Sequence, residues 1–317
     1  MVSRPTKIFQ DIKRNWLDLK SGIQFLITIL EEGKNPKERL DCLKFIKELT
    51  EPNERIFNLL ENLIISDSDP TIREYSASFI KEKYLEKAYD PMKWAIKHET
   101  DVNTYIIIVK TFIELGTKAS KERLIEVLEE IMNKKFIIGQ NRYDNRKFKK
   151  SLEIRLRGKK LKTLTIKELG EILTNHKVVS NLVKKYHFVF FKWKGGLLSK
   201  LDLSELGWNP ARSWEFVFEQ RIEDLSEIPG LMELKHLKRL NLSNNKLTNI
   251  KGLSKLKNLT YLMLNNNQLK DPINLRYLKK LEKLQFLSLK KNRMVKLIQK
   301  EDFPDTHLVL KDYLVFQ

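Results

Sequence analysis

The sequence predicts a multidomain protein in which an α-helical part is followed by α/β parts. Three observations predict this: helical periodicity over the first third, positive charge concentrated in the middle, and a leucine pattern near the C-terminus that repeats itself. The 317 residues, 41% hydrophobic and 32% charged, suit two or three globular domains. We expect an α-helical repeat domain over 1–133, a basic α/β linking subdomain over 134–197, and a solenoid with a parallel β-sheet and caps over 198–317.

The first region, from residue 17 to about 132, has apolar residues at the helical spacing i, i+3, i+4 and i+7. The segment NPKERLDCLKFIKEL begins at Asn35, and SDPTIREYSASFIKEK begins at Ser68, so that their prolines stand 34 residues apart. A weaker copy begins near Asp101. Each copy predicts one helix, and second helices are expected over 54–65, 91–97 and 120–132.

The segment DSDPTIREYSASFI resembles the first helix of a HEAT repeat, which commonly opens with Asp-x-Asp-Pro and continues with Arg and small residues. Asp69 is placed to cap this helix, and Pro70 to occupy its first position. The resemblance implies a protein-binding array, with a generic helical bundle as the alternative. One family of DNA repair glycosylases shares the architecture, but residues 1–133 hold 21 Lys and Arg against 23 Asp and Glu. A duplex-binding surface needs a cluster of cations, so we exclude that activity.

The middle segment carries most of the chain's charge. Residues 134–200 hold 19 Lys and Arg against 4 Asp and Glu, a net charge of +15 out of +19 for the whole chain. We expect a loop or hinge over 135–150, a strand over 151–158 where apolar residues alternate, two helices over 165–186 that join near Asn175, and a strand over 187–196 that ends in a Gly-Gly turn.

Helix, helix, strand and turn is an order that resembles winged helix-turn-helix DNA-binding proteins, with Lys192 and Lys194 on the wing. The chain departs from that family because Thr174, Asn175 and His176 stand where a glycine is usual. We favour a small basic linking subdomain, and weak binding of nucleic acid or another polyanion is the alternative. The candidate polyanion-binding residues are Lys159, Lys160, Lys184, Lys185, Lys192 and Lys194.

The last third of the chain copies itself. LKRLNLSNNKL at 237–247 returns as LTYLMLNNNQL at 259–269 and as LQFLSLKKNRM at 284–294, with starts 22 and 25 residues apart. In each copy two leucines alternate with polar or aromatic residues, which predicts a short strand that buries its leucines. An asparagine follows each strand, and its amide is expected to be buried against the backbone of the turn. These asparagines are Asn245, Asn267 and Asn292.

This pattern, LxxLxLxxNx(L/M), resembles the leucine-rich repeat family, in particular its short 22-residue class, known from a regulatory subunit of protein phosphatase 1. The resemblance implies parallel strands on the concave face of a solenoid, and a protein partner bound there. A regulatory subunit of an enzyme is a further alternative on this analogy. The strand spacing already starts in LLSKLDLSEL at 197–206, and strands at 214–220 and 307–316 are expected to belong to the caps.

The outward positions of successive strands should stack into rows across the concave sheet. A solvated face would carry Lys, Glu and Thr, whereas these rows bring together aromatic residues, Met and Arg, which interaction surfaces favour. We therefore predict a protein-protein interaction scaffold or adaptor. The candidate partner-binding residues are Arg239, Asn241, Tyr261, Met263, Phe286, Ser288 and Lys290. The first row is Arg239, Tyr261 and Phe286, the second is Asn241, Met263 and Ser288, and the third is Ser243, Asn265 and Lys290.

No motif predicts catalysis, a cofactor or a metal. The sequence has no Gly-rich phosphate loop and no GxSxG elbow, and its five histidines form no HxxxH or HxH pair. The Asp67-x-Asp69 pair is explained by helix capping. The N-terminal segment lacks the apolar run of a signal peptide, and no run is long enough to span a bilayer. Because Cys42 is the single cysteine and lies in a helical pattern, we expect a buried thiol in a cytoplasmic, non-enzymatic protein.

Overall fold

The computed structural model describes residues 3–133, 145–186, 189–204, 206 and 221–311. The chain divides into two compact units, residues 1–124 and 125–317, and it passes from the first to the second within helix α8 (Lys118–Asn133). The described part of the basic middle segment lies in the second unit together with the leucine repeats. The three-domain boundaries near residues 133 and 197 remain a prediction.

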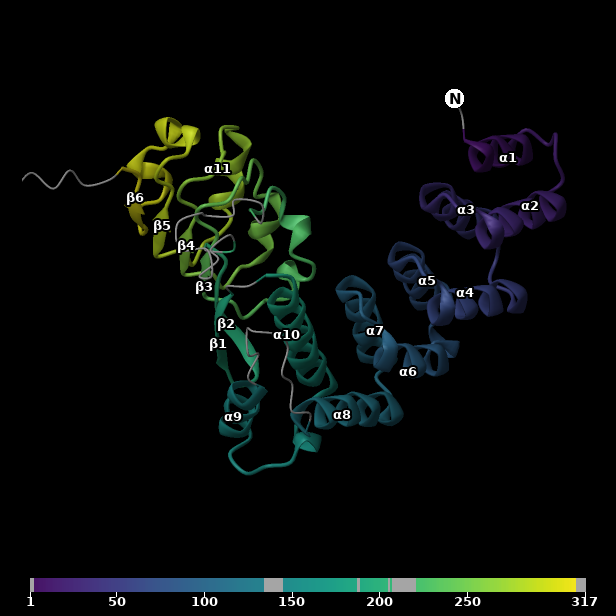
Figure 1. Cartoon of the computed structure of the whole chain (residues 1–317), viewed down its shortest axis with the longest axis horizontal. Coiled ribbons are helices and arrows are strands. Elements are labelled where there is room, and N and C mark those ends of the chain that lie inside the picture. Colours follow the sequence, from purple (N-terminus) through teal and green to yellow (C-terminus); the bar gives the residue numbers. More distant parts are fainter. Residues whose placement is uncertain (1–2, 134–144, 187–188, 205, 207–220, 312–317) are drawn as a thin grey trace, which may run out of the picture. The chain divides into compact units, whose positions relative to one another are not determined.

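The first unit is built of paired helices, as the sequence predicts. Helices α1, α3, α5 and α7 pack side by side in one row, while α2, α4 and α6 pack against them (Figure 1). The expected first and second helices of each copy are confirmed. The helices are α1 (Arg4–Lys13), α2 (Leu19–Glu32), α3 (Pro36–Leu49), α4 (Glu54–Ser66), α5 (Pro70–Lys83), α6 (Tyr89–His98), α7 (Val102–Leu115) and the start of α8.

The first helices of the copies begin where polar side chains cap them. Asn35 accepts a hydrogen bond from the N–H of Lys37 at 3.0 Å, which opens α3. Asp69 and Asp101 do the same for α5 and α7, with oxygen–nitrogen distances of 2.7 and 2.8 Å. Prolines occupy the first turn of α3 and α5, where a missing N–H costs nothing. The capping side chains and the prolines therefore determine where these helices begin.

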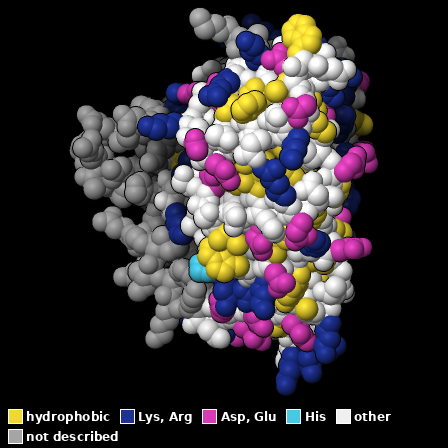
Figure 2. Space-filling view, turned by 90° about the vertical axis from the view of Figure 1, so that its right-hand side faces the viewer, with side chains coloured by type: hydrophobic (Ala, Val, Ile, Leu, Met, Phe, Trp, Pro, Cys, Tyr) yellow, Lys and Arg dark blue, Asp and Glu magenta, His cyan; other side chains and the backbone are white. Residues whose placement is uncertain are grey.

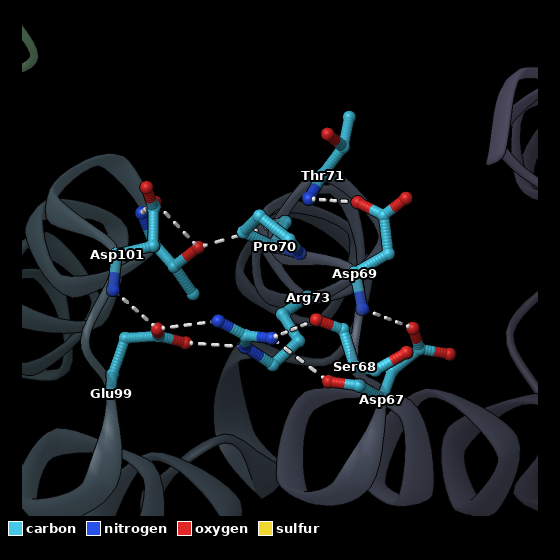
Figure 3. Close-up of polar contacts among 9 residues, drawn as sticks. Asp67, Ser68, Asp69, Pro70, Thr71, Arg73, Glu99 and Asp101 are labelled. Atoms are coloured by element: carbon cyan, nitrogen blue, oxygen red, sulfur yellow. Dashed lines mark hydrogen bonds and ion pairs between the residues drawn. The ribbon is translucent and has the colours of Figure 1, made fainter.

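An arginine–carboxylate pair repeats between neighbouring helix pairs. Arg73 donates both Nε and Nη2 to the carboxylate of Glu99, each at 2.9 Å, and its Nη1 donates to the carbonyl oxygen of Asp67 at 2.8 Å (Figure 3). Arg39, 34 residues earlier, donates Nη1 and Nη2 to the carboxylate of Asp67. Each acid also accepts a hydrogen bond from the N–H of the second residue after it. Asp69 caps α5, as predicted, whereas the side chain of Asp67 is held by Arg39 and by the N–H of Asp69.

The surface of the helical unit mixes both signs of charge. Dark-blue Lys and Arg side chains intermingle with magenta Asp and Glu side chains over the face shown in Figure 2. This agrees with the near balance of 21 and 23 such residues over 1–133. The face offers no field of one sign that would attract a polyanion.

The second unit combines helices with one sheet. Strand β1 forms an antiparallel hairpin with β2, and β2 to β6 are parallel and follow one another in chain order across the six-stranded sheet. The elements are α9 (Asn145–Leu156), α10 (Ile166–Lys185), β1 (Phe190–Lys194), β2 (Leu197–Asp202), β3 (Arg239–Asn241), β4 (Tyr261–Met263), α11 (Ile273–Leu278), β5 (Phe286–Ser288) and β6 (His307–Val309).

The leucines of the repeats form the core of the solenoid. Leu240, Leu262 and Leu287 are register partners on β3, β4 and β5, and each is fully buried. Leu201 on β2 continues this row and is also fully buried. The strand predicted from the LLSKLDL spacing is therefore confirmed as a member of the parallel sheet. A single copy could not bury these leucines, whereas stacked copies do.

The buried asparagines form a ladder at the turns after the strands. The amide nitrogen of Asn267 donates to the carbonyl oxygens of Leu242 at 2.9 Å and Leu264 at 3.0 Å, and its Oδ1 accepts from the N–H of Leu247 at 3.0 Å. Asn245 and Asn292 make the equivalent bonds one repeat away. Because each amide joins two successive copies, these residues are structural, as predicted.

The strand predicted over 151–158 is wrong, because these residues belong to helix α9 and the turn that follows it. Leu152 and Leu156 are buried, but Ile154 between them is 67% exposed. Apolar residues at i and i+4 share one face of a helix, so the helical pattern accounts for the burial. The short alternation of Leu152, Ile154 and Leu156 fits a strand and a helix equally well.

The two helices predicted over 165–186 form one continuous helix, α10, and the winged helix-turn-helix interpretation is therefore wrong. No glycine or proline interrupts the chain near Asn175. The side-chain amide of Asn175 bonds back to the carbonyl oxygen of Glu171 at 2.8 Å, and its Oδ1 accepts from the N–H of Leu198 at 2.9 Å. The β1–β2 hairpin, which turns at Gly195 and Gly196 with φ of 61° and 76°, extends the parallel sheet instead of forming a wing.

Some expected elements fall partly or wholly outside the described residues. The strand expected over 214–220 lies outside them, as does most of the loop expected over 135–150, whose last residues begin α9. The closing strand expected over 307–316 is confirmed as β6 for His307–Val309. The predicted strand over 187–196 is confirmed as β1, which begins at Phe190.

Candidate interaction surface

One row of side chains runs across the whole sheet on the face opposite the leucine core. The strand register pairs Lys192 with Lys200, Lys200 with Arg239, Arg239 with Tyr261, Tyr261 with Phe286, and Phe286 with His307. We call these six residues the central row. Three cations from β1, β2 and β3 are thus followed by three rings from β4, β5 and β6. The predicted neighbours Arg239, Tyr261 and Phe286 are brought together.

The rings of the central row stack on one another. The centroids of Tyr261 and Phe286 are 4.2 Å apart with an interplanar angle of 5°, and His307 lies 5.5 Å from Phe286. The guanidinium carbon of Arg239 lies 4.1 Å from the centroid of Tyr261. Because the ring faces are occupied by each other, the edges of Tyr261 and Phe286 point outward. Such edges carry positive partial charge and attract oxygen atoms of a partner.

The second row of the predicted surface differs in accessibility. Asn241 and Met263 are half-buried register partners, and the hydroxyl of Tyr261 lies 3.4 Å from the sulfur of Met263. Ser288 is 1% exposed, and its hydroxyl donates to Oδ1 of Asn265 at 2.6 Å. Ser288 therefore lies on the predicted face, but its side chain is buried there. Met263 continues the apolar surface of Tyr261.

The side chains of the third row contact the sheet itself and contribute little to its exposed surface. Ser243 is 5% exposed, and Oδ1 of Asn265 accepts from the backbone N–H of Lys290 at 2.9 Å. Lys290 itself is half-buried. Asn265 therefore bridges β4 to β5 through Ser288 and Lys290. Whether Lys290 also contacts a partner stays a prediction.

The candidate polyanion-binding lysines are spread over three places. Lys159 and Lys160 follow α9, while Lys184 and Lys185 lie in the last turn of α10, where Lys185 donates to the carbonyl oxygen of Glu227 at 3.1 Å. Lys192 and Lys194 are exposed on β1. Of the six, Lys192 alone joins the central row. Their binding role stays a prediction.

Lys200 and His307 extend the predicted surface and were not among its candidates. Lys200 stands one residue before the buried Leu201, as Arg239 stands before Leu240. The leucine spacing of the segment at 197–206 could have placed Lys200 in the row, because that spacing aligns it with Arg239. His307 needed the register of β6, which a three-residue strand outside the repeat pattern does not reveal.

Cys42 and His176 are both buried. Cys42 is fully buried, as predicted, and burial raises the pKa of its thiol to about 12. His176 is buried against Phe148 and Nε2 lies 3.1 Å from Oδ1 of Asn145, and burial lowers its pKa to about 3. Across the described ranges, no group of three or more His, Cys, Asp or Glu side chains is placed to hold a metal ion, and no helix is long and apolar enough to cross a membrane.

Comparison with known families identifies the repeats. Residues 235–277, which contain β3, β4 and nearly all of α11, match the family model described as Leucine Rich repeats (2 copies). The crystal structure of an internalin C2 from Listeria monocytogenes is 25% identical over 37% of this chain and 55% of its own, with a TM-score of 0.24. The family match assigns leucine-rich repeats to residues 235–277, which follow the paired helices in the chain.

A second similarity is to a protein of a different description. The chain is 22% identical over 175 residues to Transposase A from transposon Tn554 of Staphylococcus aureus, in strains that include Mu50 and N315. The match covers 54% of this chain and 46% of the transposase. The chain thus spans about half the length of the curated relatives that it matches.

Proposed function

We propose that this leucine-rich repeat protein is a non-catalytic interaction module that holds a protein partner on the concave face of its parallel sheet. The composition of the central row carries the proposal. Arg239, Tyr261 and Phe286 stand in register on three neighbouring strands, beside the half-buried Met263. Aromatic residues, Met and Arg are enriched in interfaces relative to the rest of a protein surface.

The row also indicates the chemistry of the partner. Its β1 end carries Lys192, Lys200 and Arg239, and its β6 end presents the edges of stacked rings. Cations and ring edges both favour negatively charged or carbonyl oxygen atoms. We therefore expect a partner whose contact surface has acidic groups facing the cations and carbonyl oxygen atoms facing the ring edges.

The stacked rings also stabilise the sheet, so the test must separate binding from folding. An offset or stacked aromatic pair adds roughly 0.5–1.5 kcal/mol beyond its buried area. Removal of Tyr261 and Phe286 should lower the melting temperature by several degrees, because it removes both the stacking and the partly buried ring surface. A loss of partner far beyond that cost would indicate that the row forms part of an interface.

The experiment is affinity capture from nuclease-treated native extract with the wild type and with the double variant Tyr261→Ala and Phe286→Ala. Mass spectrometry identifies the captured proteins, and thermal melting checks the fold. The matched control is Tyr277→Ala, which removes a half-buried aromatic from α11, in the return segment away from the strands (Figure 1). We expect the double variant to lose a partner that the wild type and Tyr277→Ala retain. An unchanged set of partners, or the same loss in Tyr277→Ala, would contradict the proposal.

A further inference from the structure

A pocket at the β1 end of the sheet combines aromatic rings with lysines. It has a volume of about 430 Å³ and opens between the first turn of α9 and the β1–β2 hairpin. It belongs wholly to the second unit. The residues that line it are Lys147, Phe190, Phe191, Lys192, Trp193 and Lys200.

Trp193, in the wall of this pocket, has a hydrogen-bond donor without a partner. Its side chain is held by Phe148 and Phe191, whose ring centroids lie 5.0 and 5.9 Å away, and only 8% of it is exposed. Its indole Nε1 is buried without a hydrogen-bond partner. A buried indole N–H ordinarily finds an acceptor, and it can only donate. The indole nitrogen itself is out of reach of solvent, so Trp193 contributes an apolar wall to the pocket.

Phe190 supplies a flat apolar surface beside that donor. Its side chain is 53% exposed, although it is one of the largest apolar side chains of the sheet. No other ring stacks on it among the described residues. The rings of Tyr261 and Phe286, in contrast, occupy each other's faces. Phe190 thus has a face free to receive another planar ring.

The three lysines come from three different elements. Lys147 lies in α9, Lys192 in β1 and Lys200 in β2, and the last two are register partners. Like charges gathered around one pocket repel each other unless an anion joins them. The surrounding segment 134–200 has a net charge of +15, so the field over the pocket favours an anion.

We propose that this pocket binds a nucleotide unit of a single-stranded nucleic acid. The base stacks on Phe190, and a phosphate lies among the lysines. Single-strand binding sites combine a basic groove with aromatic side chains on which bases stack, and they show little sequence preference. An acidic peptide would satisfy the lysines but would leave the face of Phe190 without a partner. A duplex keeps the faces of its bases inside the stack and does not fit.

This inference goes beyond the proposed protein-binding function and does not depend on it. Phe190 and Trp193 stand outside the central row, and Tyr261 and Phe286 do not line the pocket. Lys192 and Lys200 belong to both surfaces, so the variants that separate the two functions are those of Phe190, which leave the central row unchanged. Either function can fail while the other holds.

The test uses the full-length protein and fluorescence anisotropy at low salt. The labelled probe is a single strand of about 15 thymidines, and the comparisons are an abasic strand of the same length and a polyglutamate of matched charge. We expect the thymidine strand to bind roughly tenfold more tightly than the abasic strand, since base stacking on one aromatic side chain accounts for about that factor. Its affinity should fall steeply as salt rises.

Three sets of variants locate the binding. Phe190→Ala should abolish the preference for thymidine over the abasic strand, and Phe190→Leu, which keeps the apolar bulk without a flat ring, should do the same. The pair Lys147→Ala and Lys192→Ala should weaken both strands and reduce the slope of log affinity against log salt by about 1–2. The matched control, Lys255→Ala with Lys270→Ala, removes two exposed charges outside the pocket and should change affinity much less.

Several results would overturn the proposal. These are no binding of the thymidine strand at low salt, equal binding of thymidine and abasic strands, or tighter binding of polyglutamate. An equal loss of affinity in the control pair would show a diffuse basic surface instead of a pocket. Circular dichroism melting of each variant confirms that it is folded, and because Phe190 is exposed its replacement should leave the melting temperature unchanged.

Discussion

The buried asparagine after each strand is the residue on which the stacking of the repeats most depends. Asn267 is 7% exposed and it satisfies backbone groups of two successive copies with one amide. Its nearest carbonyl partner in the preceding copy belongs to Leu242, 25 residues away in sequence. A short strand of three residues has few ladder bonds of its own, so these side-chain bonds hold neighbouring turns in register.

Replacement of Asn267 by Ala should lower the free energy of unfolding by about 2–3 kcal/mol, because it leaves buried backbone groups without partners. Urea unfolding followed by circular dichroism measures the change. The matched control is Gln268→Ala, at the exposed neighbouring position, which should change stability by about 0.5 kcal/mol or less. Equal effects of the two replacements would show that the amide of Asn267 does not carry this role.

At the level of the elements, the helical unit is joined from pair to pair by one repeated polar contact. The side chain of Arg73 is 14% exposed and that of Glu99 is 2% exposed, so the pair lies largely out of water. Burial alone would raise the pKa of Glu99, but hydrogen bonds from Arg73 and from the N–H of Asp101 outweigh burial and hold the pKa below its ordinary value of 4.5. The ionised pair therefore favours the folded state.

This contact predicts a pH dependence. Because the folded pKa of Glu99 is lowered, its contribution is present above the ordinary pKa of 4.5 and is lost as the pH falls through the folded value. Glu99→Gln should destabilise the helical unit by about 3 kcal/mol at pH 7, since it leaves Arg73 buried without its counter-ion. Its stability should also fall less than that of the wild type on acidification below about pH 4.5.

Denaturant unfolding at neutral and acidic pH measures both effects. Glu86→Gln removes an exposed carboxylate from the same unit and serves as the control, with a change of about 0.5 kcal/mol or less expected at pH 7. If Glu99→Gln kept the wild-type stability at pH 7, or lost as much on acidification as the wild type, the role given to the pair would be contradicted.

The elements that the sequence predicts correctly are those fixed by local chemistry. Caps and prolines mark the starts of α3 and α5, and the leucine spacing marks β3, β4 and β5. The errors fall where tertiary packing decides. Asn175 stands where a break was expected, but its bond to Leu198 of β2 needs the folded hairpin to be in place. The residues of α9 have a pattern too short to distinguish a helix from a strand.

For the molecule as a whole, the sequence predicts which side chains face the concave surface but not how accessible they are. Leucine spacing alone places Tyr261 and Phe286 side by side, and the structure confirms this placement. The leucine spacing could not show that Ser288 is buried by its hydrogen bond to Asn265, because that bond joins two copies. The pocket around Trp193 could not be predicted from the sequence either, because it brings Lys147 together with residues more than forty positions later in the chain.

Charge is distributed over the molecule so that the two units differ. The helical unit is nearly balanced, whereas the basic segment lies beside the sheet in the second unit and contributes Lys192 and Lys200 to the central row. Both proposed surfaces are therefore on the second unit, and both favour negatively charged ligands. The aromatic composition of each surface, not the charge, distinguishes a protein partner from a nucleic acid.

The central claim, that the concave face holds a protein partner, is tested most directly by site-specific photocrosslinking. A photoreactive phenylalanine analogue replaces Met263 on the concave face in one variant and Tyr277 on α11 in the other. After irradiation in nuclease-treated native extract, we expect a discrete protein adduct from position 263 and none from position 277. Excess unlabelled wild-type protein should suppress the adduct, whereas the double variant Tyr261→Ala and Phe286→Ala should not. An adduct from position 277 alone, or equal adducts from both positions, would contradict the claim.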